Sequence, residues 1–236
     1  MKPQIISADA GHHNANMDAT IRRVKEGSQW KRLDTVMIIP TGLSVPTKCV
    51  ASWMNMYAPP NNKFYRMWMI NQEVGNAYTT AIENILAHPQ LSKYKYIVSL
   101  EHDQVVQPDA LVKLLESMEA YPQFAAISGL YWTRGSLGCA QIWGDPRDTE
   151  MNFRPQVPIL NSVQECCGLG MGLTAFRLEM FKDERLRRPW FKTQTEGGVS
   201  TQDLFFFSDV RQYGYRCAVN TSILVGHYDI DSDITY

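Results

Sequence analysis

Short apolar runs alternate with amphipathic stretches over roughly the first half of the chain. The run from Thr35 to Ile39 is rich in β-branched residues and stops at Pro40, which predicts a buried strand that ends in a loop. The run from Tyr96 to Leu100 predicts a second buried strand. A helix with its apolar residues on one face is expected to follow Pro108. Further strands are expected at 63–70 and 125–128, and further helices at 48–56 and 76–87.

This alternation predicts an α/β domain with a mainly parallel central sheet flanked by helices. In such sheets, ligands bind beyond the carboxyl ends of the strands, at the point where the strand order reverses. The relevant strand ends in this chain are Pro40-Thr41 and Glu101-His102-Asp103. A ligand site is therefore expected where these two segments meet.

After Ser128 the pattern changes to short β-like pieces between Gly- and Pro-rich turns. A helix is expected from Gln202 to Tyr213 with Gly214 as its C-terminal cap, followed by two short strands near 216–219 and 223–225. Residues 1–34 are polar and charged, so we interpret them as an N-terminal extension to a single domain over 35–236. His12 and His13 in this extension are a weak metal-site candidate, because such pairs in polar tails seldom bind metals.

The formal net charge of −1 argues against general nucleic-acid binding. A local basic run, Arg185 to Arg188, is interpreted as the solvated face of a helix. No apolar stretch approaches the roughly 20 residues that span a bilayer, and the N-terminal region lacks the apolar core of a signal peptide. The five cysteines form no Cys-x-x-Cys pair, which indicates reduced thiols, a cytoplasmic location and no cysteine zinc site.

Candidate metal ligands follow two apolar runs. Glu101 and Asp103 come directly after a buried strand, and their hard oxygen ligands suit Mg²⁺ or Mn²⁺. His227 follows the apolar run Ile223 to Val225 and would complete a carboxylate–imidazole site. The alternatives are an ordinary polar loop after a strand and a core histidine.

Asp203 comes shortly after Gly197-Gly198, where a helix is expected to begin. A carboxylate in this place is either a helix N-cap or a general base that removes a proton from an acceptor hydroxyl. The residues Phe206, Phe207 and Val210 follow at i+3, i+4 and i+7, so the helix is expected to be anchored in the core by one face.

The order of these parts resembles that of the GT-A glycosyltransferases, the nucleotide-diphospho-sugar transferases, especially those similar to family 2. The matching segments span about 35–229 and are Pro40-Thr41, Asn76, Glu101 to Asp103 with Pro108, Ser128 to Arg134, Cys167 to Arg177, Pro189 to Phe191, Gln202 to Phe206 and Gly226-His227. The resemblance implies a GT-A fold and a metal-dependent glycosyltransferase, which moves a sugar from a nucleotide-diphospho-sugar donor to a hydroxyl acceptor.

The resemblance also implies a role for particular residues. Asp103 and His227 would bind Mn²⁺ or Mg²⁺ at the donor diphosphate, and Asp203 would be the base of an inverting enzyme. Donor contacts would come from Pro40, Thr41, Asn76, Glu101, Gly168 and Gly170, the donor being a UDP- or GDP-linked sugar. Arg134 and Trp190 would contact the acceptor, which stays open between a glycan, a small molecule and a modified nucleic-acid base.

Two positions depart from the family pattern. Glu101 stands where the first aspartate of the usual Asp-x-Asp motif is expected, and Gln202 stands where a glutamate usually precedes the base. A retaining glycosyltransferase therefore stays open as an alternative. A sugar nucleotidyltransferase is disfavoured because the loop after the first strand contains only one glycine, Gly42. A catalytically inactive sugar-nucleotide-binding module is disfavoured because Asp103, Asp203 and His227 occur together.

Overall fold

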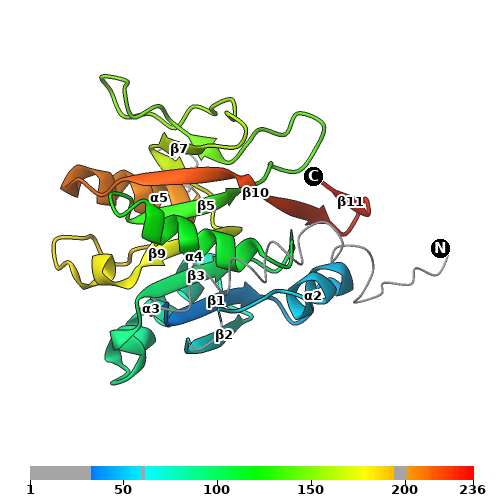
Figure 1. Cartoon of the computed structure of the whole chain (residues 1–236), viewed down its shortest axis with the longest axis horizontal. Helices are drawn as coiled ribbons and strands as arrows, with labels where there is room; N and C mark the ends of the chain where they lie inside the picture. The colour runs from blue at the N-terminus through cyan, green and yellow to red at the C-terminus, as the bar shows by residue number, and fades with distance from the viewer. Residues whose placement is uncertain (1–32, 60–61, 194–200) are drawn as a thin grey trace.

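The computed structural model describes residues 33–59, 62–193 and 201–236, which build a central sheet with helices on both of its faces (Figure 1). The described residues form a nine-stranded sheet with the strands β1 (Thr35–Thr41), β2 (Phe64–Ile70), β3 (Tyr96–Leu100), β4 (Gln104–Val106), β5 (Ala126–Leu130), β7 (Val163–Cys166), β9 (Leu173–Arg177), β10 (Cys217–Asp229) and β11 (Ile234–Thr235). A second, two-stranded sheet pairs β6 (Ile142–Trp143) with β8 (Gly168–Leu169).

Four α-helices lie in the described part of the chain, namely α2 (Thr47–Met54), α3 (Val74–Ala87), α4 (Ala110–Ala120) and α5 (Gln202–Val210). Three short 3-10 helices accompany them: η2 (Leu91–Lys93), η3 (Leu178–Lys182) and η4 (Arg211–Tyr213). No helix among the described residues has the length and apolar character needed to cross a bilayer.

The main sheet has the strand order β11-β10-β5-β9-β3-β1-β2. Strand β1 runs parallel to both β2 and β3, and β10 runs parallel to β5. Strand β9 lies antiparallel between β3 and β5, so β3 and β5 point the same way. The expected mainly parallel α/β sheet is therefore confirmed, whereas the antiparallel strand at its centre was not expected.

Alternate residues of β1 divide the core into two layers. Val36 and Ile38 pack in the core on the face covered by α3 and α5, and Met37 and Ile39 pack in the core under α2 and α4. Successive side chains of a strand point to opposite faces, so a strand covered on both sides must be apolar throughout. All seven residues of β1 are buried, which explains why its five central residues, 36–40, form an unbroken apolar run between two threonines.

Three expected boundaries need correction. The pair of strands expected near 216–219 and 223–225 is one long strand, β10, whose pairing with β5 shifts register between Asn220 and Leu224. The helix expected directly at Pro108 begins at Ala110, with Asp109 as its N-cap. Leu33, assigned to the N-terminal extension, is only 1% exposed and belongs to the core. The predictions for residues 1–32, which include His12 and His13, and for Gly197-Gly198 concern residues outside the described part of the chain.

Candidate functional site

A polar cavity of about 270 Å³ opens at the carboxyl ends of β1 and β3. Its lining residues are Pro40, Thr41, Gly42, Gln72, Val74, Glu101, His102, Asp103 and Gln202. Because β1 and β3 are parallel neighbours, the two strand ends picked out in the sequence lie side by side in this wall. The cavity thus occupies the place where α/β sheets bind ligands.

Backbone pairing brings Asp103 and His227 together although 124 residues separate them. Strand β4 follows Asp103 directly and pairs antiparallel with β10, so that Gln104 lies opposite His227. The carbonyl oxygen of Asp103 also accepts a hydrogen bond of 2.8 Å from the backbone N–H of Tyr228. As a result, Nε2 of His227 lies 3.2 Å from Oδ2 of Asp103.

The hydrogen bonds of His227 define its tautomer. Nδ1 lies 2.8 Å from the carbonyl oxygen of Trp132, which can only accept, so Nδ1 carries a hydrogen. Nε of Arg134 donates to Nε2 at 3.1 Å, so Nε2 carries a lone pair. The bare nitrogen of a neutral imidazole therefore faces the carboxylate of Asp103, and the guanidinium of Arg134 contacts both atoms.

The carboxylate of Asp103 is held in its charged form. Burial by itself raises the pKa of this carboxyl group, whose side chain is 10% exposed, but the contact with His227 and the hydrogen bond from Gln104 outweigh that effect. The pKa of Asp103 consequently lies below its usual range. Nε2 of Gln104 donates to Oδ1 at 3.0 Å, which leaves Oδ2 directed toward His227 and Arg134.

The Asp103–His227 pair fits a divalent ion. Ligand atoms on neighbouring positions of an octahedral ion with bonds of about 2.1 Å lie about 3 Å apart, close to the 3.2 Å between these two atoms. Metal-bound histidines commonly donate their other ring N–H to a backbone carbonyl, as His227 does to Trp132. Within the described residues, no group of three or more His, Cys, Asp or Glu side chains converges on one point, so this site would offer two protein ligands.

Two further carboxylates, those of Glu101 and Asp203, interact electrostatically in this region. Burial, together with the charges of Asp103 and Asp203, raises the pKa of Glu101 to about 8. The Oε1 atom of Glu101 lies 3.5 Å from the hydroxyl of Tyr78. Because the charge of Asp203 acts on Glu101, the helix-borne carboxylate lies within electrostatic range of the cavity wall.

Asp203 is the second residue of α5, which has Thr201 as its N-cap. Its Oδ1 accepts a hydrogen bond of 2.8 Å from the backbone N–H of Leu204 and another from the hydroxyl of Thr201. Burial raises its pKa, although these bonds oppose the shift. The expected anchoring of the helix is confirmed, since Phe206, Phe207 and Val210 are each 1% exposed.

Several other residues with an expected role lie away from the cavity lining. Asn76 is exposed on α3, where its backbone N–H donates to Glu73. Gly168 and Gly170 are buried, and a Cβ atom on Gly170 would come within 2.0 Å of the hydroxyl oxygen of Tyr131. Close packing inside the protein therefore explains the need for glycine at 170 without any ligand.

Trp190 is a core residue in this structure. Its side chain is 1% exposed, and its ring packs edge-on against Phe181 with the ring centres 5.7 Å apart. The guanidinium of Arg188 covers the ring at 4.5 Å from its centre. An acceptor could reach this indole only after displacement of its neighbours, so the position does not fit the implied acceptor contact.

Gly42, Val74 and three polar residues of the cavity wall were not predicted as site residues from the sequence. Gln72 lies two residues beyond the end of β2, His102 lies between the two acidic residues, and Gln202 begins α5. The position of Gln72 could have been predicted from the sequence. Strand β2 was expected, and polar residues that follow parallel strands lie at the same edge of the sheet as the ligand site. Gln202 was noted only as a departure from a family pattern.

A second and larger cavity of about 570 Å³ lies next to this site. Trp132 and Gly226, which flank His227 in space and in sequence, form part of its wall together with Ala51 and Ser52 of α2. Its lining is mainly apolar, which suits a hydrocarbon group better than a phosphate. The smaller polar cavity therefore remains the candidate site for charged ligands.

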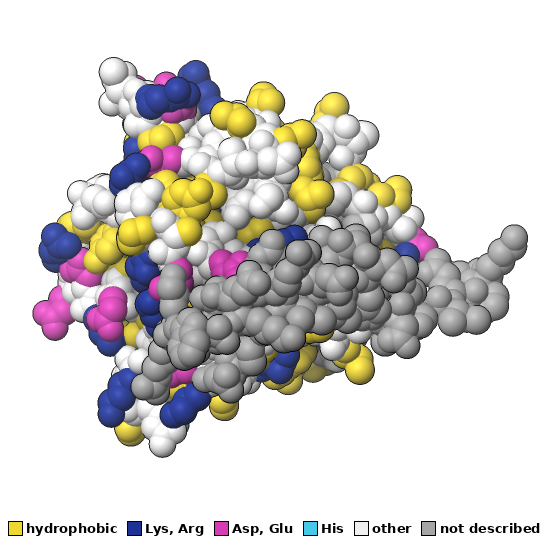
Figure 2. Space-filling view, viewed as in Figure 1, with side chains coloured by type: hydrophobic (Ala, Val, Ile, Leu, Met, Phe, Trp, Pro, Cys, Tyr) yellow, Lys and Arg dark blue, Asp and Glu magenta, His cyan; other side chains and the backbone are white. Residues whose placement is uncertain are grey.

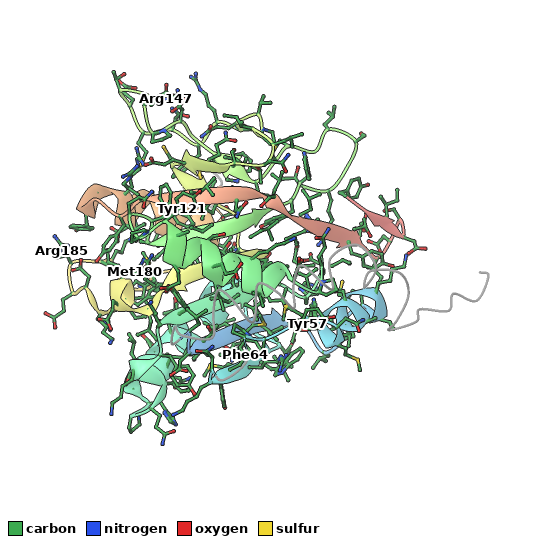
Figure 3. The ribbon with its side chains drawn as sticks, viewed as in Figure 1. Tyr57, Phe64, Tyr121, Arg147, Met180 and Arg185 are labelled. Atoms are coloured by element: carbon green, nitrogen blue, oxygen red, sulfur yellow. The ribbon has the colours of Figure 1, made fainter. Side chains whose placement is uncertain are left out.

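The basic run from Arg185 to Arg188 needs a correction, because it lies in turns and bends rather than in a helix. Arg185 projects at the edge of the molecule (Figure 3) and pairs with Asp183. The guanidinium of Arg187 donates to the carbonyl oxygen of Phe205 and lies 3.5 Å from the centre of its ring. These side chains therefore stabilise the chain locally.

We expect this run to bind duplex DNA of random sequence only weakly. Its arginines are engaged within the protein, and on the uncovered part of the face in Figure 2 basic and acidic side chains are mixed. Binding measured by fluorescence anisotropy at 50 and 200 mM salt tests this. Tight binding that falls steeply with salt, and that Arg185→Ala weakens, would contradict the expectation.

The comparisons with known proteins inform the fold alone. No protein-family model and no curated protein matches the chain. Among solved structures, the chain is similar to A197 from STIV, with a TM-score of 0.58 over 83% of this chain and 86% of that one. The two sequences are 17% identical, so the likeness supports a shared α/β architecture and says nothing of activity.

Proposed function

We propose that the chain is a metal-dependent glycosyltransferase of the GT-A fold, acting on a nucleotide-diphospho-sugar donor and a hydroxyl acceptor. The observation that carries this proposal is the convergence of Asp103 and His227, with the bare Nε2 atom 3.2 Å from the carboxylate. Both residues were selected from the sequence as metal ligands because each follows a separate apolar run. Their juxtaposition at the carboxyl edge of a mainly parallel sheet supports a site for a cation and its phosphate ligand.

Asp103 and His227 would hold Mn²⁺ or Mg²⁺, which neutralises the negative charge that develops on the leaving diphosphate. Mg²⁺ and Mn²⁺ sites of few protein ligands keep positions for substrate phosphates and water. The cavity of about 270 Å³ is slightly smaller than most small-molecule sites. Its size and polar lining suit a diphosphate better than a complete sugar nucleotide, so the sugar and base would extend beyond it.

Asp203 would act as the general base on the acceptor hydroxyl. The side chain is fixed by Thr201 and Leu204, and α5 is anchored by buried phenylalanines, so the carboxylate is held in a defined place. Its raised pKa makes it a stronger base than an exposed aspartate. An inverting mechanism requires one such base on the face of the sugar opposite the leaving group.

A donor screen tests the proposed function. We expect release of the nucleoside diphosphate from at least one UDP- or GDP-linked sugar in the presence of Mn²⁺, because the metal stabilises that leaving group. EDTA should stop the release. If no sugar nucleotide in a broad panel is turned over or bound in a Mn²⁺-dependent way, the proposal fails.

A further inference from the structure

The guanidinium of Arg134 occupies the position between Asp103 and His227. One terminal nitrogen donates to Oδ2 of Asp103, and Nε donates to Nε2 of His227 at 3.1 Å. These acceptors are the same two atoms that would ligate a metal. The lone pair on Nε2 can accept a hydrogen bond from an N–H group or ligate a metal ion. The Oδ2 atom of Asp103 has the same two alternatives.

The surroundings of Arg134 allow it to leave this position. Its side chain is 41% exposed, whereas that of Asp103 is 10% exposed. The residue lies in the loop that follows β5, where the backbone N–H of Thr133 bonds to the carbonyl oxygen of Cys139 at 2.9 Å. Gly135, the next residue, has a φ of +95°. An outward rotation of the arginine side chain would therefore disturb no core packing.

We infer that Arg134 is an internal cation that occupies the metal position, and that its guanidinium must swing out before a metal can bind. The inference rests on the proposed function, because it takes Asp103 and His227 as the ligands. A buried carboxylate facing a bare imidazole nitrogen is costly without a positive charge nearby. Arg134 supplies that charge in the metal-free protein and keeps both side chains in the orientation that a metal requires.

Competition of this kind has a measurable consequence. The apparent dissociation constant for the metal equals the intrinsic constant divided by the fraction of molecules in which Arg134 is turned outward. If Arg134 is turned outward in about one molecule in ten, the dissociation constant of the wild-type protein is about tenfold higher than that of a protein without this side chain. The effect appears with the metal alone and needs no donor or acceptor.

Titration of the full chain with Mn²⁺ alone, by isothermal calorimetry, tests the inference. Arg134→Ala should bind Mn²⁺ about tenfold more tightly than the wild type or better. Arg134→Lys should bind with an intermediate affinity, because it keeps the charge and loses the planar fork. Arg147→Ala is the matched control: Arg147 also pairs with a carboxylate, that of Asp145, on a loop at the edge of the molecule (Figure 3).

A thermal melt in the presence of Mn²⁺ provides a second readout of the same binding. The metal should raise the unfolding temperature of Arg134→Ala more than that of the wild type, since tighter binding stabilises the folded state further. Equal or weaker Mn²⁺ binding by Arg134→Ala would overturn the inference while leaving the metal site standing. Absence of Mn²⁺ binding in the wild type and in Arg134→Ala alike would overturn both the inference and the proposed metal dependence.

Discussion

Replacement of Asp103 by asparagine is expected to abolish the effect of Mn²⁺ on nucleotide binding. The amide of the variant is neutral and a poor ligand for a hard cation, while its shape is that of the carboxylate. Wild-type protein should bind UDP or GDP, whichever is the nucleotide of its donor, much more tightly with Mn²⁺ than without. The variant should bind that nucleotide equally in both conditions, measured by calorimetry.

The matched control for this experiment is Asp145→Asn. Asp145 also forms an ion pair with an arginine, Arg147, but it does not line the polar cavity. This second variant should keep the full response to Mn²⁺. Folding is checked by the thermal unfolding midpoint of each variant. An unchanged response to Mn²⁺ in a folded Asp103→Asn protein would remove Asp103 from the metal site and, with it, the main support for the proposed function.

Much of the sheet could be predicted from the sequence because its central strands are covered on both faces. Such a strand is apolar along most of its length, so β1 and β3 stand out as short runs of mainly apolar residues. The same reasoning predicted where β1 and β3 end, and therefore where the polar cavity lies. Strand β9 gave a weaker signal, because its direction depends on partners far away in the sequence and not on its own residues.

Asp103 and His227 were predicted to lie together because each of them follows an apolar run in the sequence. The contact of Arg134 with both residues was not foreseen, and Arg134 was assigned to the acceptor. The position of Arg134 depends on the conformation of the loop after β5. Hydrophobic periodicity predicts helices and strands but not the conformation of a loop. Trp190 is an example of the reverse error. A motif match assigned this residue to the site, whereas its ring packs against Phe181 in the core.

Replacement of Asp203 by asparagine is expected to lower turnover by about a hundred-fold or more, as for the loss of a positioned base. Asparagine retains an oxygen that can accept the hydrogen bonds from Leu204 and Thr201, so α5 should begin as it does in the wild type. Turnover is measured as nucleoside diphosphate released from the donor that the screen identifies. Donor affinity and the unfolding midpoint should change little.

The pH dependence separates a base from a structural carboxylate at Asp203. A base must be deprotonated, and burial raises the pKa of this side chain, so the wild-type rate should fall as the pH drops through a value above that of an ordinary aspartate. The residual activity of Asp203→Asn should lack this acidic limb. Asp209→Asn is the control, because Asp209 lies on the same helix and accepts a bond from the backbone of Arg187. Near wild-type transfer by Asp203→Asn, with donor binding intact, would reject the base role and favour a retaining mechanism in which Asp203 only supports the start of α5.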